Sequence, residues 1–204
     1  MDLVLKFKLN LTSVVPTLRS MLIDSLDGAV KFSGLYDSMY QSYWIPTVYT
    51  NSTGTVHPNL IRLIAGIRNQ NGKKIIEPSN QGLLSYGKRS SPYHGEILNP
   101  DAPCKTIICS YKNCPRLFVG LIDTTGQRWL RCLLIHELIK IQGFPRNYKF
   151  FGSHSDIITQ VGNAVPPAIV TNIVNQFESV KFSIVRFGGD LSETESDNDN
   201  EHEI

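Results

Sequence analysis

The sequence of 204 residues lacks a continuous apolar run of about 18 residues, which a membrane-spanning helix requires. Its first residues alternate apolar and polar side chains, so a cleaved secretory signal is not predicted either. The four cysteines, at positions 104, 109, 114 and 132, lack the paired close spacing of a zinc site, and no nearby pair of histidines completes one. We therefore expect no metal site, and reduced, mostly structural thiols in an intracellular protein.

Acidic residues are concentrated at the C-terminal end. Residues 190–204 hold seven of the 18 Asp and Glu residues and no Lys or Arg, which leaves 20 bases against 11 acids in residues 1–189, a formal charge of +9. A basic body with an acidic tail suits a polyanionic ligand such as DNA. A solubilising tail beside an ordinary basic surface accounts for the same distribution equally well. We expect residues 188–204 to be disordered.

Hydrophobic periodicity predicts short, mixed elements in the first two thirds of the chain. Residues 3–11 alternate as a half-buried strand does, and residues 97–130 contain several short apolar runs separated by turns. Residues 28–57 are aromatic and irregular, whereas residues 69–95 are rich in loop-forming and basic residues. The expected helices in this part are 16–26 and 59–67, and the expected later strands are 97–98, 106–108 and 117–119.

The last third predicts three helices. An apolar stripe runs from Leu133 to Gln142, and Gly143 can end that helix in a left-handed conformation. A second helix is expected from Ser155, acting as its cap, to Gly162. A third helix is expected from Pro166, with its buried face formed by Val165, Ile169, Ile173, Val174 and Phe177.

Short sequence motifs in this last third indicate one protein family. They are, in order, Arg131-x-Leu133-x-x-x-Glu137, Gln142-Gly143-Phe144-Pro145, Tyr148-x-Phe150, Gly152-Ser153 and Gln160-Val161-Gly162-Asn163-Ala164-Val165-Pro166-Pro167. Together they closely resemble the ninth and tenth conserved blocks of DNA cytosine-5 methyltransferases. One position departs from the family, because Leu134 stands where a helix-capping Thr is usual.

The resemblance extends more weakly to Leu98-x-Pro100-Asp101-x-Pro103-x-x-Thr106-Ile107, which is similar to the end of the family's target-recognition domain. In the family that domain reads base edges in the major groove and helps to hold the flipped cytosine. The resemblance covers residues 96–180. It implies a mixed α/β chain with an irregular, mainly β recognition domain at 1–128 and a helical segment of the methyltransferase domain at 129–187. The doubly wound sheet that binds S-adenosylmethionine would be missing.

Catalytic segments of the family are absent from this sequence. We find no F-x-G-x-G, no Glu-Asn-Val and no Gln-x-Arg-x-Arg segment. The family needs a Pro-Cys nucleophile that adds to carbon 6 of the flipped base, a Glu on ring nitrogen 3, and a methyl group from S-adenosylmethionine. Pro103-Cys104 resembles the nucleophile only superficially, because Asn99 to Ala102 precede it where an apolar strand is needed. We assign no catalytic residue and expect the chain to be inactive alone.

Two groups of residues are candidates for binding. Gly162, Asn163, Ala164 and Val165 line the methionine side of the cofactor site in the family, or they form only a turn between two helices. Thr106, Lys88, Arg89, Lys112 and Arg116 are candidates for DNA contacts, although any single base can equally be a solvated surface residue.

The sequence thus predicts the C-terminal half, or specificity subunit, of a DNA cytosine-5 methyltransferase. It would recognise double-stranded DNA and complete the S-adenosylmethionine site of a partner chain that carries the catalytic Cys. An alternative is a non-catalytic DNA-binding protein derived from a truncated methyltransferase, and a third is an inactive product of a decaying reading frame.

Overall fold

The computed structural model describes residues 15–34, 38–76, 81–89 and 91–187, with backbone only for 178–187. Residues Ser13–Ala164 form one compact unit, and helix α4 (Pro167–Phe187) belongs to a second. The strand expected at 3–11 and the acidic tail at 188–204 lie outside the described residues. The division expected at residue 128 falls at the start of a central strand, and the compact unit continues beyond it to Ala164.

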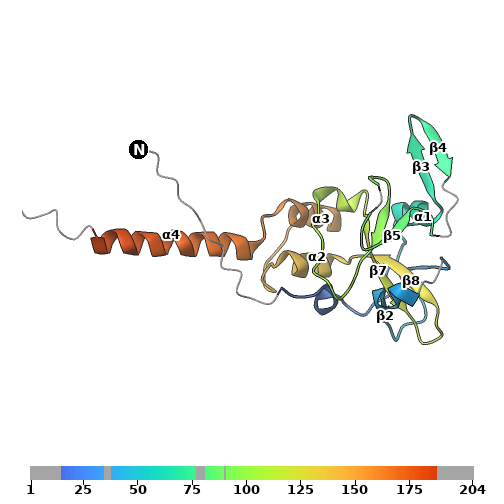
Figure 1. The fold of residues 1–204 in the computed structure, drawn as a ribbon, viewed down its shortest axis with the longest axis horizontal. Helices are drawn as coiled ribbons and strands as arrows, with labels where there is room; N and C mark the ends of the chain where they lie inside the picture. Colours follow the sequence, from blue (N-terminus) through green and yellow to red (C-terminus); the bar gives the residue numbers. More distant parts are fainter. Residues whose placement is uncertain (1–14, 35–37, 77–80, 90, 188–204) are drawn as a thin grey trace, which may run out of the picture. The chain divides into compact units, whose positions relative to one another are not determined.

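The compact unit is built on a mixed six-stranded sheet in the order β1-β8-β7-β6-β5 (Figure 1). Its strands are β1 (Val30–Lys31), β2 (Trp44–Pro46), β5 (Leu84–Tyr86), β6 (Gly95–Ile97), β7 (Leu117–Ile122) and β8 (Arg128–Cys132). Strand β7 is central because its continuous apolar run can be buried on both faces. It pairs antiparallel with β8, while β6 and β2 pair in parallel with its first and last residues.

Side chains alternate along β7 and β8 between two hydrophobic cores. Leu117, Val119 and Leu121 enter one core, whereas Phe118 enters the other. The first core also receives residues of η1 (Leu18–Met21), η3 (Cys109–Lys112), α2 (Ile135–Gln142) and α3 (His154–Asn163), and the second receives α1 (Pro58–Ile64). The sheet is therefore covered on both faces, and it holds α2 and α3 on one of them.

A separate two-stranded hairpin, β3 (Ile67–Gln70) and β4 (Lys73–Ile76), follows α1 and projects from the body (Figure 1). Its loop is Asn71-Gly72, with φ angles of 49° and 74°. Two residues with positive φ make the turn that matches the twist of a hairpin, and Asn-Gly is its preferred sequence. The loop expected over this stretch is therefore wrong, because Asn71-Gly72 is itself a hairpin turn signal between two strands.

Two further expectations are corrected by contacts between segments that are distant in the sequence. Only η1 forms within residues 16–26, because Leu18 and Arg19 donate their N–H groups to the carbonyls of Ala102 and Pro100, at 2.9 and 2.8 Å. These long-range bonds replace the local bonds of a helix. Residues 106–108 form no strand, because α3 packs directly against the backbone of Ile108. The remaining 3-10 helix, η2, spans Ser38–Tyr43.

The helices of the last third begin and end close to the expected residues. Helix α2 ends at Gly143, with the predicted left-handed φ of 83°. Helix α3 is capped by Ser153 rather than Ser155: Asp156 returns a bond to the N–H of Ser153 at 2.9 Å and completes a capping box.

Helix α4 differs from expectation in burial. Val165 before it and Ile169, Val174 and Phe177 on it, predicted to form a buried face, are each between 41% and 62% exposed, and only Ile173 is half-buried. The stretch His154–Phe177 is long and apolar enough on average to cross a membrane. That is weak evidence, because helices of soluble proteins pass the same criterion, and the backbone between α3 and α4 is extended at Ala164.

Candidate nucleic-acid interface

A fully buried ion pair joins β8 to α2. The guanidinium of Arg131 bonds both carboxylate oxygens of Glu137, at 2.7 and 2.8 Å, and both side chains have no exposed surface. Arg131 also donates to the carbonyls of Ile23, Ser25 and Cys132, so all five of its N–H groups are used. Glu137 in turn accepts the N–H groups of Ile23 and Leu134. The pair therefore fixes the start of α2 and the segment 23–25 in one geometry.

Leu134 occupies the cap position of α2 without a side-chain acceptor. Glu137 still supplies its half of a capping box by accepting the N–H of Leu134 at 2.7 Å. The departure from the family at this position therefore removes one capping bond and leaves the ion pair intact.

Tyr111 connects η3 to the same junction. Its hydroxyl donates to the carbonyl of Leu117 and accepts the N–H of Leu133, both at 2.8 Å. Burial raises the pKa of this phenol well above its ordinary value, so Tyr111 is protonated and acts as a structural link.

The motif residues of the last third of the chain have structural roles in α2, in α3 and in the connection between these helices. Gln142 donates from its side chain to the carbonyl of Ala164 at 2.6 Å, which joins the ends of the two helices. Gln160 likewise donates to the carbonyl of Phe151 at 2.8 Å. Gly152 has a φ of 99°, which side-chain-bearing residues rarely adopt. Between the helices Phe144, Tyr148 and Phe150 form a cluster with ring centroids 4.8 to 5.0 Å apart.

Gly162, a predicted cofactor contact, faces the protein interior. A Cβ atom there would lie 2.6 to 2.7 Å from backbone atoms of Ile108 and Cys109. The glycine thus allows α3 to approach η3. The carbonyl of Ala164 is already bonded to Gln142, whereas the side chains of Asn163 and Val165 are exposed. Of the four candidates, only Asn163 and Val165 have side chains free to meet a ligand.

The five predicted DNA contacts lie in three places. Lys88 and Arg89 follow β5, Thr106 lies in the loop before η3, and Lys112 and Arg116 lie between the end of η3 and the start of β7. The first three are exposed and the last two are half-buried.

A buried carboxylate brings two of these places together. Glu96, on β6, has no exposed surface, and its Oε1 lies 2.6 Å from Nζ of Lys105. Lys105 also donates to the carbonyl of Gly87, the residue before Lys88. Because Lys105 directly precedes Thr106, the bond from the Lys105 side chain to Gly87 places the 87–89 and 105–106 segments side by side. Sequence reasoning missed Glu96 because an acid inside a strand gives no sign of its distant partner.

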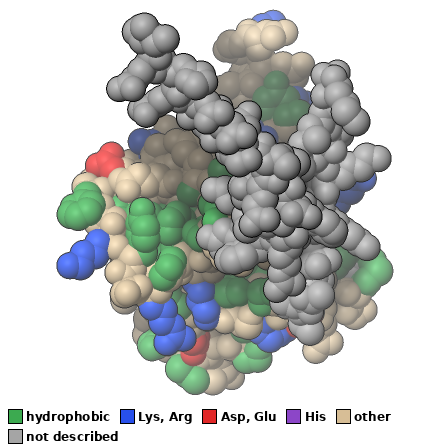
Figure 2. All heavy atoms as spheres, turned by 90° about the vertical axis from the view of Figure 1, so that its left-hand side faces the viewer, with side chains coloured by type: hydrophobic (Ala, Val, Ile, Leu, Met, Phe, Trp, Pro, Cys, Tyr) green, Lys and Arg blue, Asp and Glu red, His purple; other side chains and the backbone are tan. Residues whose placement is uncertain are grey.

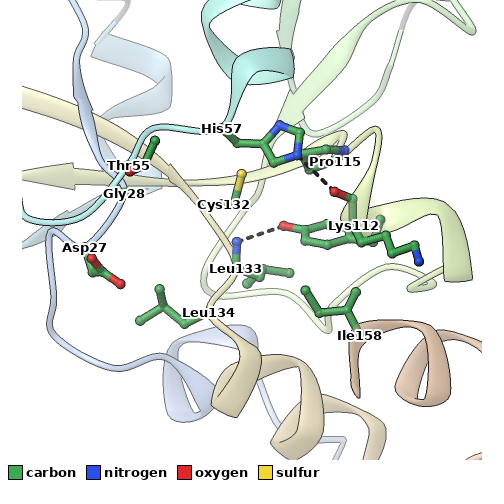
Figure 3. A pocket seen from close by; sticks show the side chains of 11 residues that line it. Asp27, Gly28, Thr55, His57, Lys112, Pro115, Cys132, Leu133, Leu134 and Ile158 are labelled. Carbon is green, nitrogen blue, oxygen red and sulfur yellow. Dashed lines mark hydrogen bonds between the residues drawn. The ribbon is translucent and has the colours of Figure 1, made fainter. Parts of the chain in front are cut away.

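A cleft of about 200 Å³ opens where α1, η3, α3 and the β8–α2 junction meet (Figure 3). Lys112 contributes to one side and Asp27 stands at the other, with an apolar lining that includes Leu133 and Ile158. The Nε2 of His57 lies 3.0 Å from the carbonyl of Lys112, and its Nδ1 accepts the N–H of Asn59 at 3.0 Å. Both ring nitrogens of His57 are therefore occupied, and His57 is not placed to act as an acid or base.

Cys104 does not have the environment of a nucleophile. Burial raises the pKa of its thiol to about 11, so almost none is thiolate at neutral pH. Its sulfur donates to the carbonyl of Lys105, and none of the hydrogen bonds it makes reaches a base. No group of three His, Cys, Asp or Glu side chains in the described part of the chain could hold a metal ion.

Comparison with known proteins identifies the class. The family described as C-5 cytosine-specific DNA methylase matches residues 46–179, about two thirds of the chain. The chain therefore belongs to this family. It is 29% identical over 115 residues to the type II methyltransferase M.AplI of Arthrospira platensis, and the match covers 55% of this chain and 32% of that protein.

Two other relatives match shorter stretches. DNA (cytosine-5)-methyltransferase 3 of Arabidopsis thaliana is 33% identical over 95 residues, which are 47% of this chain and 7% of the relative. The type II methyltransferase M.Bpa9945I of Bacillus paralicheniformis is 60% identical over 37 residues, which are 18% of this chain and 8% of the relative. The chain thus spans a third or less of the length of these relatives. No solved structure matches it.

Proposed function

We propose that this chain is the DNA-recognising, C-terminal half of a cytosine-5 methyltransferase and that a partner chain supplies the catalytic Cys and most of the S-adenosylmethionine site. The observation that carries the proposal is a mismatch within the chain. The words of the ninth and tenth blocks build an intact α2–α3 hairpin, yet the nucleophile, Glu-Asn-Val and glycine-loop segments are absent from the sequence.

The exposed side of α4 supports the need for a partner. Ile169, Val170, Val174 and Phe177 recur at helical spacing and are 41% to 47% exposed. Figure 2 shows hydrophobic side chains gathered among Lys and Arg on the face that it presents. A helix with an uncovered apolar stripe gains free energy when another surface removes that stripe from water. The apolar stripe is the proposed docking surface for the partner chain.

In this proposal the protein's own residues bind and orient DNA. Basic side chains at Lys88, Arg89, Lys112 and Arg116 would contact phosphates, and Thr106 would contact the strand beside the flipped base. S-adenosylmethionine, bound mainly by the partner chain, would supply the methyl group. Asn163, with its exposed side chain, would border it.

Methyl transfer from labelled S-adenosylmethionine to duplex DNA tests the proposal. The chain is measured alone and mixed with a candidate partner that carries F-x-G-x-G, Pro-Cys and Glu-Asn-Val segments. Activity only in the mixture is expected.

Val174→Asp, on the apolar stripe, should abolish complex formation and activity in the mixture. Asn175→Asp adds the same charge at an exposed polar position of α4 and should preserve both. Equal activity of the two variants would contradict the docking surface.

The second candidate function is a DNA-binding protein without a catalytic partner, and the basic excess of residues 1–189 favours it to the same degree. Salt-sensitive DNA binding without methyl transfer in any mixture would select this alternative.

A further inference from the structure

The β3–β4 hairpin has the composition of a DNA-binding element, and none of the predicted DNA contacts lies on it. Residues 67–76 hold three cations, Arg68, Lys73 and Lys74, and no acid. Asn69, Gln70 and Asn71 are exposed, as are both lysines. Amide side chains pair with adenine edges and lysines with guanine edges or phosphates. A hairpin with this composition fits the major groove of duplex DNA.

The base of the hairpin is held firmly to the body. Arg62, on α1, donates to the carbonyl of Ile67 at 3.1 Å, and Asn59 orients its guanidinium at 2.5 and 2.9 Å. The guanidinium of Arg68 lies over the ring of Tyr93, 5.4 Å from its centroid, and donates to the side chain of Gln70 at 3.0 Å. The base of the ribbon is therefore fixed to the body, which lowers the entropic cost of binding.

The two faces of the ribbon differ. Directly opposed residues of antiparallel strands share a face, so Arg68, Gln70 and Lys73 lie on the face that is tied to Tyr93. Asn69 and Lys74 are opposed on the other face, and neither bonds another described residue through its side chain. That face presents an amide next to an ammonium group, with Asn71 at the tip.

The dimensions also fit. The major groove, about 12 Å wide, admits a two-stranded ribbon. A strand of four residues extends about 13 Å, which is longer than the groove depth of about 8.5 Å, so the tip of the hairpin can reach the base edges. A hairpin with two strands is only marginally stable by itself, so its position depends on the contacts of Ile67 and Arg68 with the body. Its polar, cationic tip and the absence of acids favour a nucleic acid over an apolar protein surface.

We propose that β3–β4 enters the major groove of the target DNA, that Asn69 reads a base edge, and that Lys73 and Lys74 contact flanking phosphates. This inference rests on the proposed function, because it names the part of the chain that would select the target sequence.

Equilibrium binding of the full chain to duplex DNA tests it. Sequence preference is first determined by selection from a random duplex pool, and affinity is then measured across salt concentrations. Lys73→Ala with Lys74→Ala should lower the slope of log K against log salt by about 1.8, since each phosphate contact contributes about 0.9. Asn69→Ala should leave the slope unchanged and reduce discrimination at one base pair by roughly 5- to 150-fold.

Lys149→Ala and Asn147→Ala are the matched controls, because both residues are exposed and lie in the connection between α2 and α3. They should change neither quantity, and all variants should keep the wild-type melting temperature. A wild-type chain that does not bind DNA would overturn the proposed function and this inference together. Binding that the hairpin variants leave unchanged, that the controls weaken equally, or that shows no sequence preference would overturn the inference alone.

Discussion

Removing one member of the buried Arg131–Glu137 pair should destabilise the compact unit severely. In Glu137→Gln the guanidinium keeps its charge, loses its counter-charge, and meets an amide N–H₂ group where an oxygen stood 2.7 to 2.8 Å away. Breaking a buried pair in this way costs about 3–5 kcal/mol. In a unit of this size each kcal/mol lowers the melting temperature by about 2–4 °C, so a decrease of roughly 6–20 °C is expected.

Urea unfolding of the wild type, Glu137→Gln, Arg131→Met and the double variant measures this free energy. The double variant should be more stable than Glu137→Gln, because no lone buried charge remains. It should stay below the wild type, because the carbonyls of Ile23 and Ser25 lose their donor and a single amide oxygen can accept only one of the N–H groups of Ile23 and Leu134. A loss below about 1 kcal/mol in Glu137→Gln would be typical of an exposed pair and would refute the assigned burial.

Three other predictions concern single residues. Helix propensity alone predicts that Gly162→Ala stabilises the protein by about 1 kcal/mol. The added Cβ atom would, however, collide with the backbone of Cys109, so we expect a net loss of about 1–3 kcal/mol. Chemical unfolding of the variant measures the sign of the change in free energy. Cys104, whose thiol pKa is about 11, should react with iodoacetamide at pH 7.5 more slowly than the exposed Cys109. Peptide mass spectrometry measures both rates, and equal rates would contradict the burial of Cys104. Hydrogen bonds from Thr125 and Trp129 lower the pKa of Asp123 to about 2, below the ordinary value of about 3.9. Ionised Asp123 therefore stabilises the fold above about pH 4, and this contribution is lost as the pH falls toward 2. Unfolding curves of Asp123→Asn should show a shallower acid limb, and limbs parallel to the wild type would contradict the assignment.

Local signals predicted the last third of the fold well. Gly143 ends α2 in the left-handed conformation that its position required, and the turn after Gly162 follows from the Pro166-Pro167 pair. These features depend on a few neighbouring residues, so the sequence alone contains the information. The family resemblance read from the same words is confirmed by the family match over residues 46–179.

Long-range contacts account for the wrong expectations. Residues 16–26 have a helical pattern, but Pro100, Ala102 and Arg131 take up their backbone groups from about 80 to 110 positions away. The role of Glu96 depends in the same way on Lys105 and on a loop beyond β5. The exposed face of α4 has a buried-face pattern, because periodicity reports which side is apolar and not what covers it.

Methyl transfer from labelled S-adenosylmethionine to duplex DNA, with this chain alone and with a partner that carries the missing segments, tests most directly whether two chains share the enzyme. We expect no transfer by either chain alone and transfer by the mixture. Transfer by this chain alone would contradict this expectation and would make Cys104 the first candidate nucleophile, despite a thiol pKa of about 11.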